Sequence, residues 1–169
     1  MSALERLNKL LASEAKAELL RCCGSSRWAD AMVRARPFRD AEHLYSEAAW
    51  LWKQTGPEDW LEAFKHHPRI GDVSQLRAKF ASTATWSSQE QGGVSGADEA
   101  VLQGLAEGNA EYERKFGFIF LVCATGKSAA EMLELLRERL DNVPGEELRI
   151  AAGEQAKITR IRLEKLLAS

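Results

Sequence analysis

Apolar residues recur along this chain at the three- and four-residue spacing of amphipathic helices, and no pair of alternating strands appears. The pattern predicts helices over residues 3–12, 14–22, 26–35, 40–55, 57–66, 73–80, 97–116, 127–141 and 146–167. The segment 81–98 is poor in aliphatic residues and is predicted to be a loop with one helical turn. The fold class is therefore all-α, a compact single-domain helical bundle of about eight to nine helices over residues 1–169.

Local signals support several of these helix limits. Pro57 suits the first turn of a helix, and Ser128 with Glu131 has the spacing of a capping box. The sequence ATGKS at 124–128 is similar to a phosphate-binding loop, but that motif needs a glycine where Leu121 stands. The segment is therefore interpreted as a helix start.

Composition and charge narrow the class of protein. Hydrophobic residues make up 45% of the 169 residues and charged residues 28%, as in ordinary globular domains. The net charge of −2 gives no basic surface for nucleic acid. The start of the chain lacks a secretion signal, and the longest apolar run, 116–124, is too short to span a bilayer. We expect a cytoplasmic protein with no nucleic-acid or membrane partner, whose three cysteines (Cys22, Cys23 and Cys123) are reduced.

Two of the three histidines are adjacent, at His66 and His67, directly before Pro68. The helix that begins at Pro57 has an apolar face formed by Trp60, Leu61 and Phe64. At 100° per residue His67 falls about 60° from the centre of this face, and His66 about 160° away. His66 is therefore predicted to be exposed. His67 is either a catalytic imidazole or a core histidine bonded to a backbone carbonyl. A metal site built from His66, His67 and Asp72 matches no established ligand spacing, so none is predicted.

The last predicted helix carries polar residues in its apolar stripe. Gln155 and Arg162 lie between Ile158 and Leu166. The opposite side is polar and carries Arg149, Lys157, Arg160 and Glu164. Arginine is rarely buried without a partner, so Arg162 binds a planar anionic group, pairs with an internal carboxylate, or extends to water. Asn109 similarly sits in an apolar seam, where an amide is usually structural.

The segment TWSSQEQGG at 85–93 allows two interpretations. Ser87 and Glu90 have capping-box spacing and would start a short helix. Together with Gln91 they would also present a hydroxyl, a carboxylate and an amide able to bind a polar heterocycle.

Taken together, these segments resemble the 2-oxo-4-hydroxy-4-carboxy-5-ureidoimidazoline (OHCU) decarboxylase family. The resemblance rests on HPRIGD (67–72), SSQEQGGV (87–94), the run from Asn109 to Ala129 that contains KFGFIFLVCATGKSA, and EQAKITRIRLEKL (154–166). It covers nearly the whole chain. Gly92 departs from the pattern, in which alanine is expected.

The resemblance implies an all-helical, cofactor-free and metal-free decarboxylase, commonly a homodimer, that converts OHCU to (S)-allantoin and CO2 in urate degradation. By its motifs the catalytic residues are His67, Glu90 and Arg162. The implied substrate contacts are Pro68, Ser87, Ser88, Gln89, Glu90 and Gln91, and the backbone of Phe120, Leu121, Val122, Cys123 and Ala124.

Two other functions remain open at this point. One is a hydrolase of ureido or cyclic-amide compounds, whose products would be ammonia or a ring-opened acid instead of CO2. The other is a non-catalytic helical interaction module. It would leave Gln155 and Arg162 unexplained unless they take part in an internal ion pair.

Overall fold

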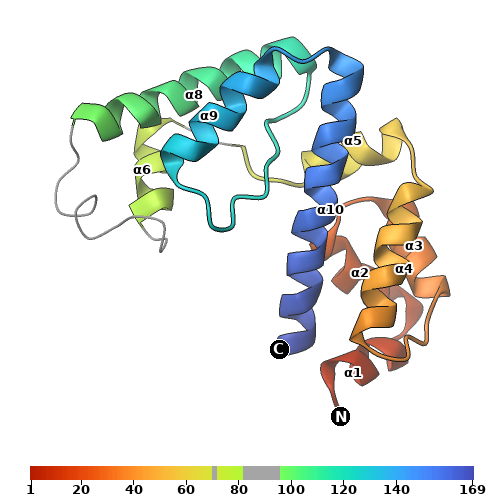
Figure 1. Cartoon of the computed structure of the whole chain (residues 1–169). Coiled ribbons are helices and arrows are strands. Elements are labelled where there is room, and N and C mark those ends of the chain that lie inside the picture. Colours follow the sequence, from red (N-terminus) through yellow and green to blue (C-terminus); the bar gives the residue numbers. More distant parts are fainter. Residues whose placement is uncertain (70–71, 82–95) are drawn as a thin grey trace. The chain divides into compact units, whose positions relative to one another are not determined.

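The computed structural model describes residues 1–69, 72–81 and 96–169, and within these ranges it contains helices and no strand (Figure 1). The helices are α1 (Ala3–Lys9), α2 (Ala12–Cys22), α3 (Ser26–Arg34), α4 (Ala41–Lys53), α5 (Pro57–Lys65), α6 (Val73–Ala81), α8 (Gly96–Phe116), α9 (Ala129–Leu140) and α10 (Pro144–Ala168). The prediction of an all-α fold is confirmed.

The helix starts follow local chemistry. The side chains of Ser25 and Asp40 accept backbone N–H groups at the starts of α3 and α4. Pro57 is the first residue of α5, and Ser128 with Glu131 forms the predicted capping box of α9. Each cap satisfies N–H groups that have no partner inside the helix.

The first helix is shorter than the predicted range 3–12, because α1 ends at Lys9. The backbone turns to an extended conformation at Leu10. The guanidinium of Arg36 donates from one nitrogen to the carbonyl oxygens of Leu7 and Leu10, at 2.8 Å each. Arg36, which is distant in sequence, thus donates to carbonyl groups that would accept backbone N–H groups in a longer helix. Helical periodicity cannot reveal such a contact.

The described chain divides into two compact units. Unit 1 consists of residues Met1–His67 and Ala152–Ser169, and unit 2 of residues Pro68–Ala151. Helix α10 contributes residues to both. Folding as a single domain stays a prediction. None of the helices in the described residues is long and apolar enough to cross a membrane.

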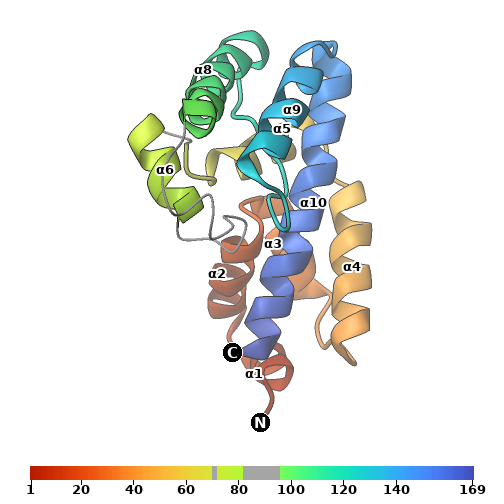
Figure 2. The same ribbon diagram turned by 60° about the vertical axis from the view of Figure 1, so that its left-hand side comes forward.

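Unit 1 surrounds two buried tryptophans. The indole N–H of Trp28 donates to the carbonyl oxygen of Ala48, and that of Trp52 donates to Ala152 in α10, both at 3.0 Å. The two chain termini lie near each other in both ribbon views (Figures 1 and 2), and Arg6 donates to the carbonyl oxygen of Ser169. Other large buried side chains of this unit are Leu19, Met32, Leu44, Phe64 and Leu163.

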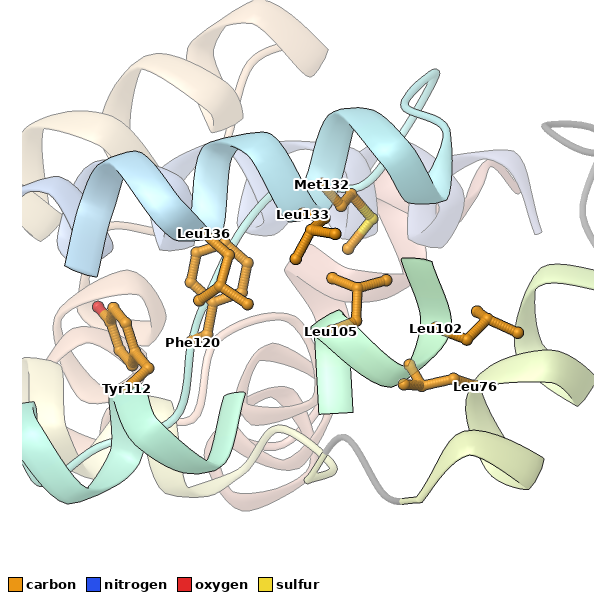
Figure 3. Close-up of a cluster of buried hydrophobic side chains, with 8 residues drawn as sticks. All are labelled: Leu76, Leu102, Leu105, Tyr112, Phe120, Met132, Leu133 and Leu136. Atoms are coloured by element: carbon orange, nitrogen blue, oxygen red, sulfur yellow. The ribbon is translucent and has the colours of Figure 1, made fainter. Parts of the chain in front are cut away.

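Unit 2 has its own apolar core, in which α8 packs against α9 and α6 (Figure 3). The buried cluster consists of Leu76, Leu102, Leu105, Tyr112, Phe120, Met132, Leu133 and Leu136. Gly108 allows the close approach of α8 and α9, because a Cβ there would lie 2.6 Å from Cδ2 of Leu136. This core fixes both ends of the segment between α8 and α9.

Candidate active site

His67 lies at the end of α5. His66 caps this helix, and the amide of His67 donates to the carbonyl oxygen of Phe64 at 3.2 Å. Pro68, which is exposed, follows and has no N–H with which to continue the helix. His67 is half-buried and His66 is exposed. The projection of α5 therefore assigned the two rings correctly.

One side of α10 presents polar side chains to the interior of unit 1. Gln155 and Thr159, one turn apart, are 0% and 6% exposed. Arg162 is half-buried on the same side. The residues predicted on the opposite side, Arg149, Lys157, Arg160 and Glu164, are all exposed. The prediction from the helical projection is confirmed for both sides.

The side chains of His67, Gln155, Thr159 and Arg162 form a connected group. Nε2 of His67 lies 2.6 Å from Oε1 of Gln155, and Nε2 of Gln155 donates to Oγ1 of Thr159 at 3.0 Å. A terminal nitrogen of Arg162 lies 3.4 Å from Nδ1 of His67. Two residues that are 95 positions apart in sequence, His67 and Arg162, are thus brought together.

This geometry identifies the partners that the sequence left open. The partner of the His67 ring is an amide side chain, so the interpretation with a backbone carbonyl is wrong. In the part of the chain that the structure describes, no carboxylate forms an ion pair with Arg162. Asn109 is structural, as expected: its amide donates to the carbonyl oxygen of Leu105 within α8.

Burial controls the protonation of this group. Burial lowers the pKa of His67, an effect that the hydrogen bond to the Gln155 oxygen opposes and the charge of Arg162 reinforces. The resting imidazole is therefore neutral at neutral pH. Burial also raises the pKa of Cys22 and Cys23 to about 11 each, although Arg162 acts in the opposite direction. Both thiols are protonated and unsuited to nucleophilic attack.

Arg162 also lines a cavity of about 520 Å³ within unit 1. The other lining residues are Glu18, Arg21, Cys22, Lys165, Leu166 and Ser169. This volume suits a small ligand. Arg21 pairs with Glu18 at 3.5 Å, so Lys165 is the cation that, with Arg162, makes the wall favourable to an anion. The guanidinium of Arg162 therefore has access to both the cavity and the His67 ring.

The second predicted contact region, Phe120–Ala124, lies in unit 2 between α8 and α9. The carbonyl oxygens of Leu121 and Cys123 are occupied: Arg139 donates to Leu121 at 2.6 Å, and the Lys127 side chain donates to Cys123 at 2.8 Å. The amides of Phe120, Leu121 and Val122 find no acceptor among the residues that the structure describes. These donors are suited to bind carbonyl or carboxylate oxygens of a ligand.

A buried ion pair holds this segment, and the sequence reasoning missed it. Arg139 donates through Nε to Glu147 at 2.8 Å, and the Tyr112 hydroxyl also bonds to Glu147. Glu147 is 0% exposed and Arg139 is 7% exposed. The four-residue series Glu147, Ala151, Gln155 in the last helix is the signal that could have placed Glu147 inside.

The remaining predicted site residues lie outside the described residues: Ser87, Ser88, Gln89, Glu90 and Gln91. Ile70 and Gly71 of the HPRIGD segment also lie outside them.

Comparison with known proteins identifies the family. The sequence model of the OHCU decarboxylase family matches residues 8–164. The chain belongs to the OHCU decarboxylase family. A 2-oxo-4-hydroxy-4-carboxy-5-ureidoimidazoline decarboxylase from Amia calva is 35% identical over 139 residues, which are 82% of this chain and 79% of that protein.

Two further relatives extend this result. The uric acid degradation bifunctional protein TTL of Arabidopsis thaliana is 42% identical over 149 residues. These residues are 87% of this chain but only 45% of the bifunctional protein, so the chain spans less than half of that relative. A crystal structure of OHCU decarboxylase in the presence of (S)-allantoin is 40% identical, with a TM-score of 0.70 over 90% of this chain and 98% of that one. The connected group around His67 is thus carried by an OHCU decarboxylase fold.

Proposed function

We propose that this chain catalyses the decarboxylation of OHCU to (S)-allantoin and CO2 in urate degradation, without a metal or cofactor. The observation that carries the proposal is the imidazole of His67, bonded to Gln155 and facing the guanidinium of Arg162, in a member of this family. The His67 imidazole can take up and return a proton, as the reaction requires. The Arg162 guanidinium has no carboxylate partner in the described chain, so it can bind an anionic substrate that loses CO2.

The substrate supplies its own electron sink. Loss of CO2 breaks the bond between the carboxylate and the ring carbon that carries the hydroxyl, and the electron pair moves into the neighbouring ring C=N. The nitrogen of that bond takes a proton from solvent. No pyridoxal or thiamine is needed, because the protein has only to orient the substrate and stabilise the intermediate.

His67 completes the reaction. The enol left by CO2 loss gives up its hydroxyl proton and gains a proton on the adjacent ring carbon, which forms the carbonyl group and the stereocentre of (S)-allantoin. A neutral imidazole that accepts the first proton and returns one to a single face ends unchanged. General acid–base catalysis of this kind contributes roughly 10²–10⁴-fold.

The other groups bind and orient the substrate. Arg162 binds its anionic or carbonyl oxygens through the planar guanidinium, and the amides in Phe120–Ala124 donate to the ring. Pro68 and the segment Ser87–Gln91 complete the site, with Glu90 as a catalytic carboxylate and Gln91 on the ureido group. The assignments of Phe120–Ala124, Pro68 and Ser87–Gln91 to the site rest on the family resemblance.

The test is to add the purified protein, with chelator present, to freshly prepared OHCU and follow allantoin by circular dichroism. We expect dextrorotatory (S)-allantoin and one CO2 per substrate, formed well above the spontaneous rate. Release of ammonia or a ring-opened acid would instead indicate a hydrolase. Racemic allantoin at the spontaneous rate would indicate a non-catalytic module and end the proposal.

We also propose that the protein is a cytoplasmic homodimer, as the family resemblance implies. Sedimentation equilibrium at micromolar concentration should give twice the 18.8 kDa chain mass. A single-chain mass over that range would contradict the dimer without affecting the proposed reaction.

A further inference from the structure

Gln155 is a fully buried amide whose two ends have different partners. Its NH2 group donates to Oγ1 of Thr159 at 3.0 Å, and its oxygen lies 2.6 Å from Nε2 of His67. A carboxamide oxygen only accepts hydrogen bonds and its nitrogen only donates. The hydrogen in the contact with His67 must therefore belong to the imidazole, on Nε2.

This contact determines the tautomer of His67. A neutral imidazole carries a single hydrogen, so a hydrogen on Nε2 leaves Nδ1 with its lone pair. Nδ1 faces a terminal nitrogen of Arg162 at 3.4 Å, and a guanidinium can only donate. Gln155 and Arg162 therefore favour the same tautomer from opposite sides of the ring.

The opposite amide orientation is disfavoured by Arg162. Turning the Gln155 amide by 180° would aim its NH2 group at Nε2 and shift the imidazole hydrogen to Nδ1, where it would meet the N–H groups of Arg162. A hydroxyl oxygen can accept a hydrogen bond, and Oγ1 of Thr159 lies 3.0 Å from the NH2 group of Gln155. The Thr159 oxygen is then an acceptor that fits the NH2 end of Gln155.

We propose that Gln155 and Thr159 are positioning residues that hold His67 as the Nε2–H tautomer, so that Nδ1 is the nitrogen that takes up and returns the proton during turnover. The role in turnover rests on the proposed function, whereas the tautomer is a property of the free protein. With the other tautomer, Nδ1 would already carry a hydrogen and could not act as the base.

The tautomer is measured directly on ¹⁵N-histidine-labelled protein by long-range ¹H–¹⁵N spectra above the pKa of His67. His66→Asn and His43→Asn variants assign the other two rings. We expect a protonated Nε2 and an unprotonated Nδ1 for His67. A dominant Nδ1–H tautomer in the wild-type protein would overturn the inference, and this result needs no turnover.

Paired variants test the positioning. Thr159→Val removes the acceptor for the Gln155 NH2 group and frees the amide to turn, so the spectra should show mixed tautomers and kcat should fall by about tenfold or more with little change in KM. Thr159→Ser keeps the hydroxyl and should restore both. An unchanged tautomer and rate in Thr159→Val would contradict the role.

A pH profile gives a further readout that a structural role would not move. Gln155→Glu places a carboxylate against Nε2, and with Arg162 and His66 unchanged it should raise the pKa of His67 and move the acidic limb of kcat/KM to higher pH. An unmoved limb would contradict the contact.

The tautomer and the proposed function can fail separately. If the wild-type protein shows the Nε2–H tautomer but no decarboxylation, the proposed function fails and the tautomer assignment stands. If a protein with the Nδ1–H tautomer decarboxylates OHCU, the proposed function stands and the tautomer assignment fails.

Discussion

The rings of His66 and His67 diverge because α5 ends at their position. The ring of His66 lies over Gly24, where a Cβ would come within 2.4 Å of it, and the residue stays exposed. His67 turns instead toward Gln155. The bulk of His66 thus has a local packing role, whereas only His67 has the partners that acid–base chemistry requires.

Replacing His67 with asparagine keeps approximate size and some hydrogen bonding but removes the titratable nitrogen. We expect kcat to fall by roughly 10²-fold or more, with little change in melting temperature. His66→Asn is the matched control and should stay within about twofold of wild type, as most exposed substitutions do. Initial rates of CO2 release, corrected for spontaneous decay, measure both. An inactive His66→Asn variant would show that the roles of the two histidines are reversed. A fully active His67→Asn variant would show that His67 has no catalytic role.

Arg162→Lys keeps the positive charge but loses the planar pair of donors, so most activity should disappear while the protein stays folded. Arg160 provides the control on the same helix, because it is exposed, pairs with Glu164 at 2.8 Å and lies over the Tyr45 ring. Arg160→Lys should leave kcat/KM nearly unchanged. Equal losses in the two variants would mean that the orientation of Arg162 has no catalytic importance.

The lowered pKa of His67 sets the direction of the pH dependence. Burial disfavours the imidazolium, so the neutral ring persists to lower pH than the ordinary 6.5 of histidine. Because the proposed reaction begins from the neutral ring, kcat/KM should fall only below pH 6.5. An acidic limb centred above 6.5 would show that a carboxylate or a protonated histidine controls activity instead.

At the scale of the element, local chemistry made most of the fold predictable. Ser128 with Glu131, and Pro57 at a first turn, are signals carried within a few residues, and the helices begin where these signals lie. The end of α1 was missed because Arg36, which takes its carbonyl groups, is distant in sequence. Helical projection likewise placed His67 and Arg162 toward the interior but gave no partner for either. Their contacts depend on the tertiary structure, which a single helix does not show.

The ion pair between Arg139 and Glu147 joins α9 to α10 and supports the carbonyl of Leu121. Glu147→Leu would leave Arg139 charged, buried and without its partner, which should lower the free energy of unfolding by about 3–5 kcal/mol. Glu146→Leu, on an exposed neighbour, should change it by less than about 0.5 kcal/mol. Urea unfolding measures both variants.

A double variant separates the ion pair from simple packing. Arg139→Met combined with Glu147→Leu removes both charges from the interior and should recover much of the lost stability. If the double variant is less stable than Glu147→Leu alone, the contact of Arg139 with the Leu121 carbonyl outweighs its pairing with Glu147.

At the scale of the whole molecule, the prediction of a single domain concerns how the two units unfold. Unit 1 is discontinuous in sequence, because Gln155, Thr159 and Leu163 of α10 complete a core otherwise built from the first 67 residues. The same helix begins in unit 2 at Pro144 and contributes the buried Glu147 there. Separate unfolding would have to interrupt α10 near Ala151, with loss of its backbone hydrogen bonds. We therefore expect one cooperative transition.

Tryptophan fluorescence offers a test, since four of the five tryptophans (Trp28, Trp50, Trp52 and Trp60) belong to unit 1 and the fifth is Trp86. In Trp86→Phe, fluorescence reports unit 1 alone, whereas far-ultraviolet circular dichroism reports the helices of both units. The two probes should give the same urea midpoint if the chain unfolds as one domain. A circular dichroism transition at lower urea, with fluorescence unchanged, would mean that α6, α8 and α9 unfold first and that the chain contains two domains.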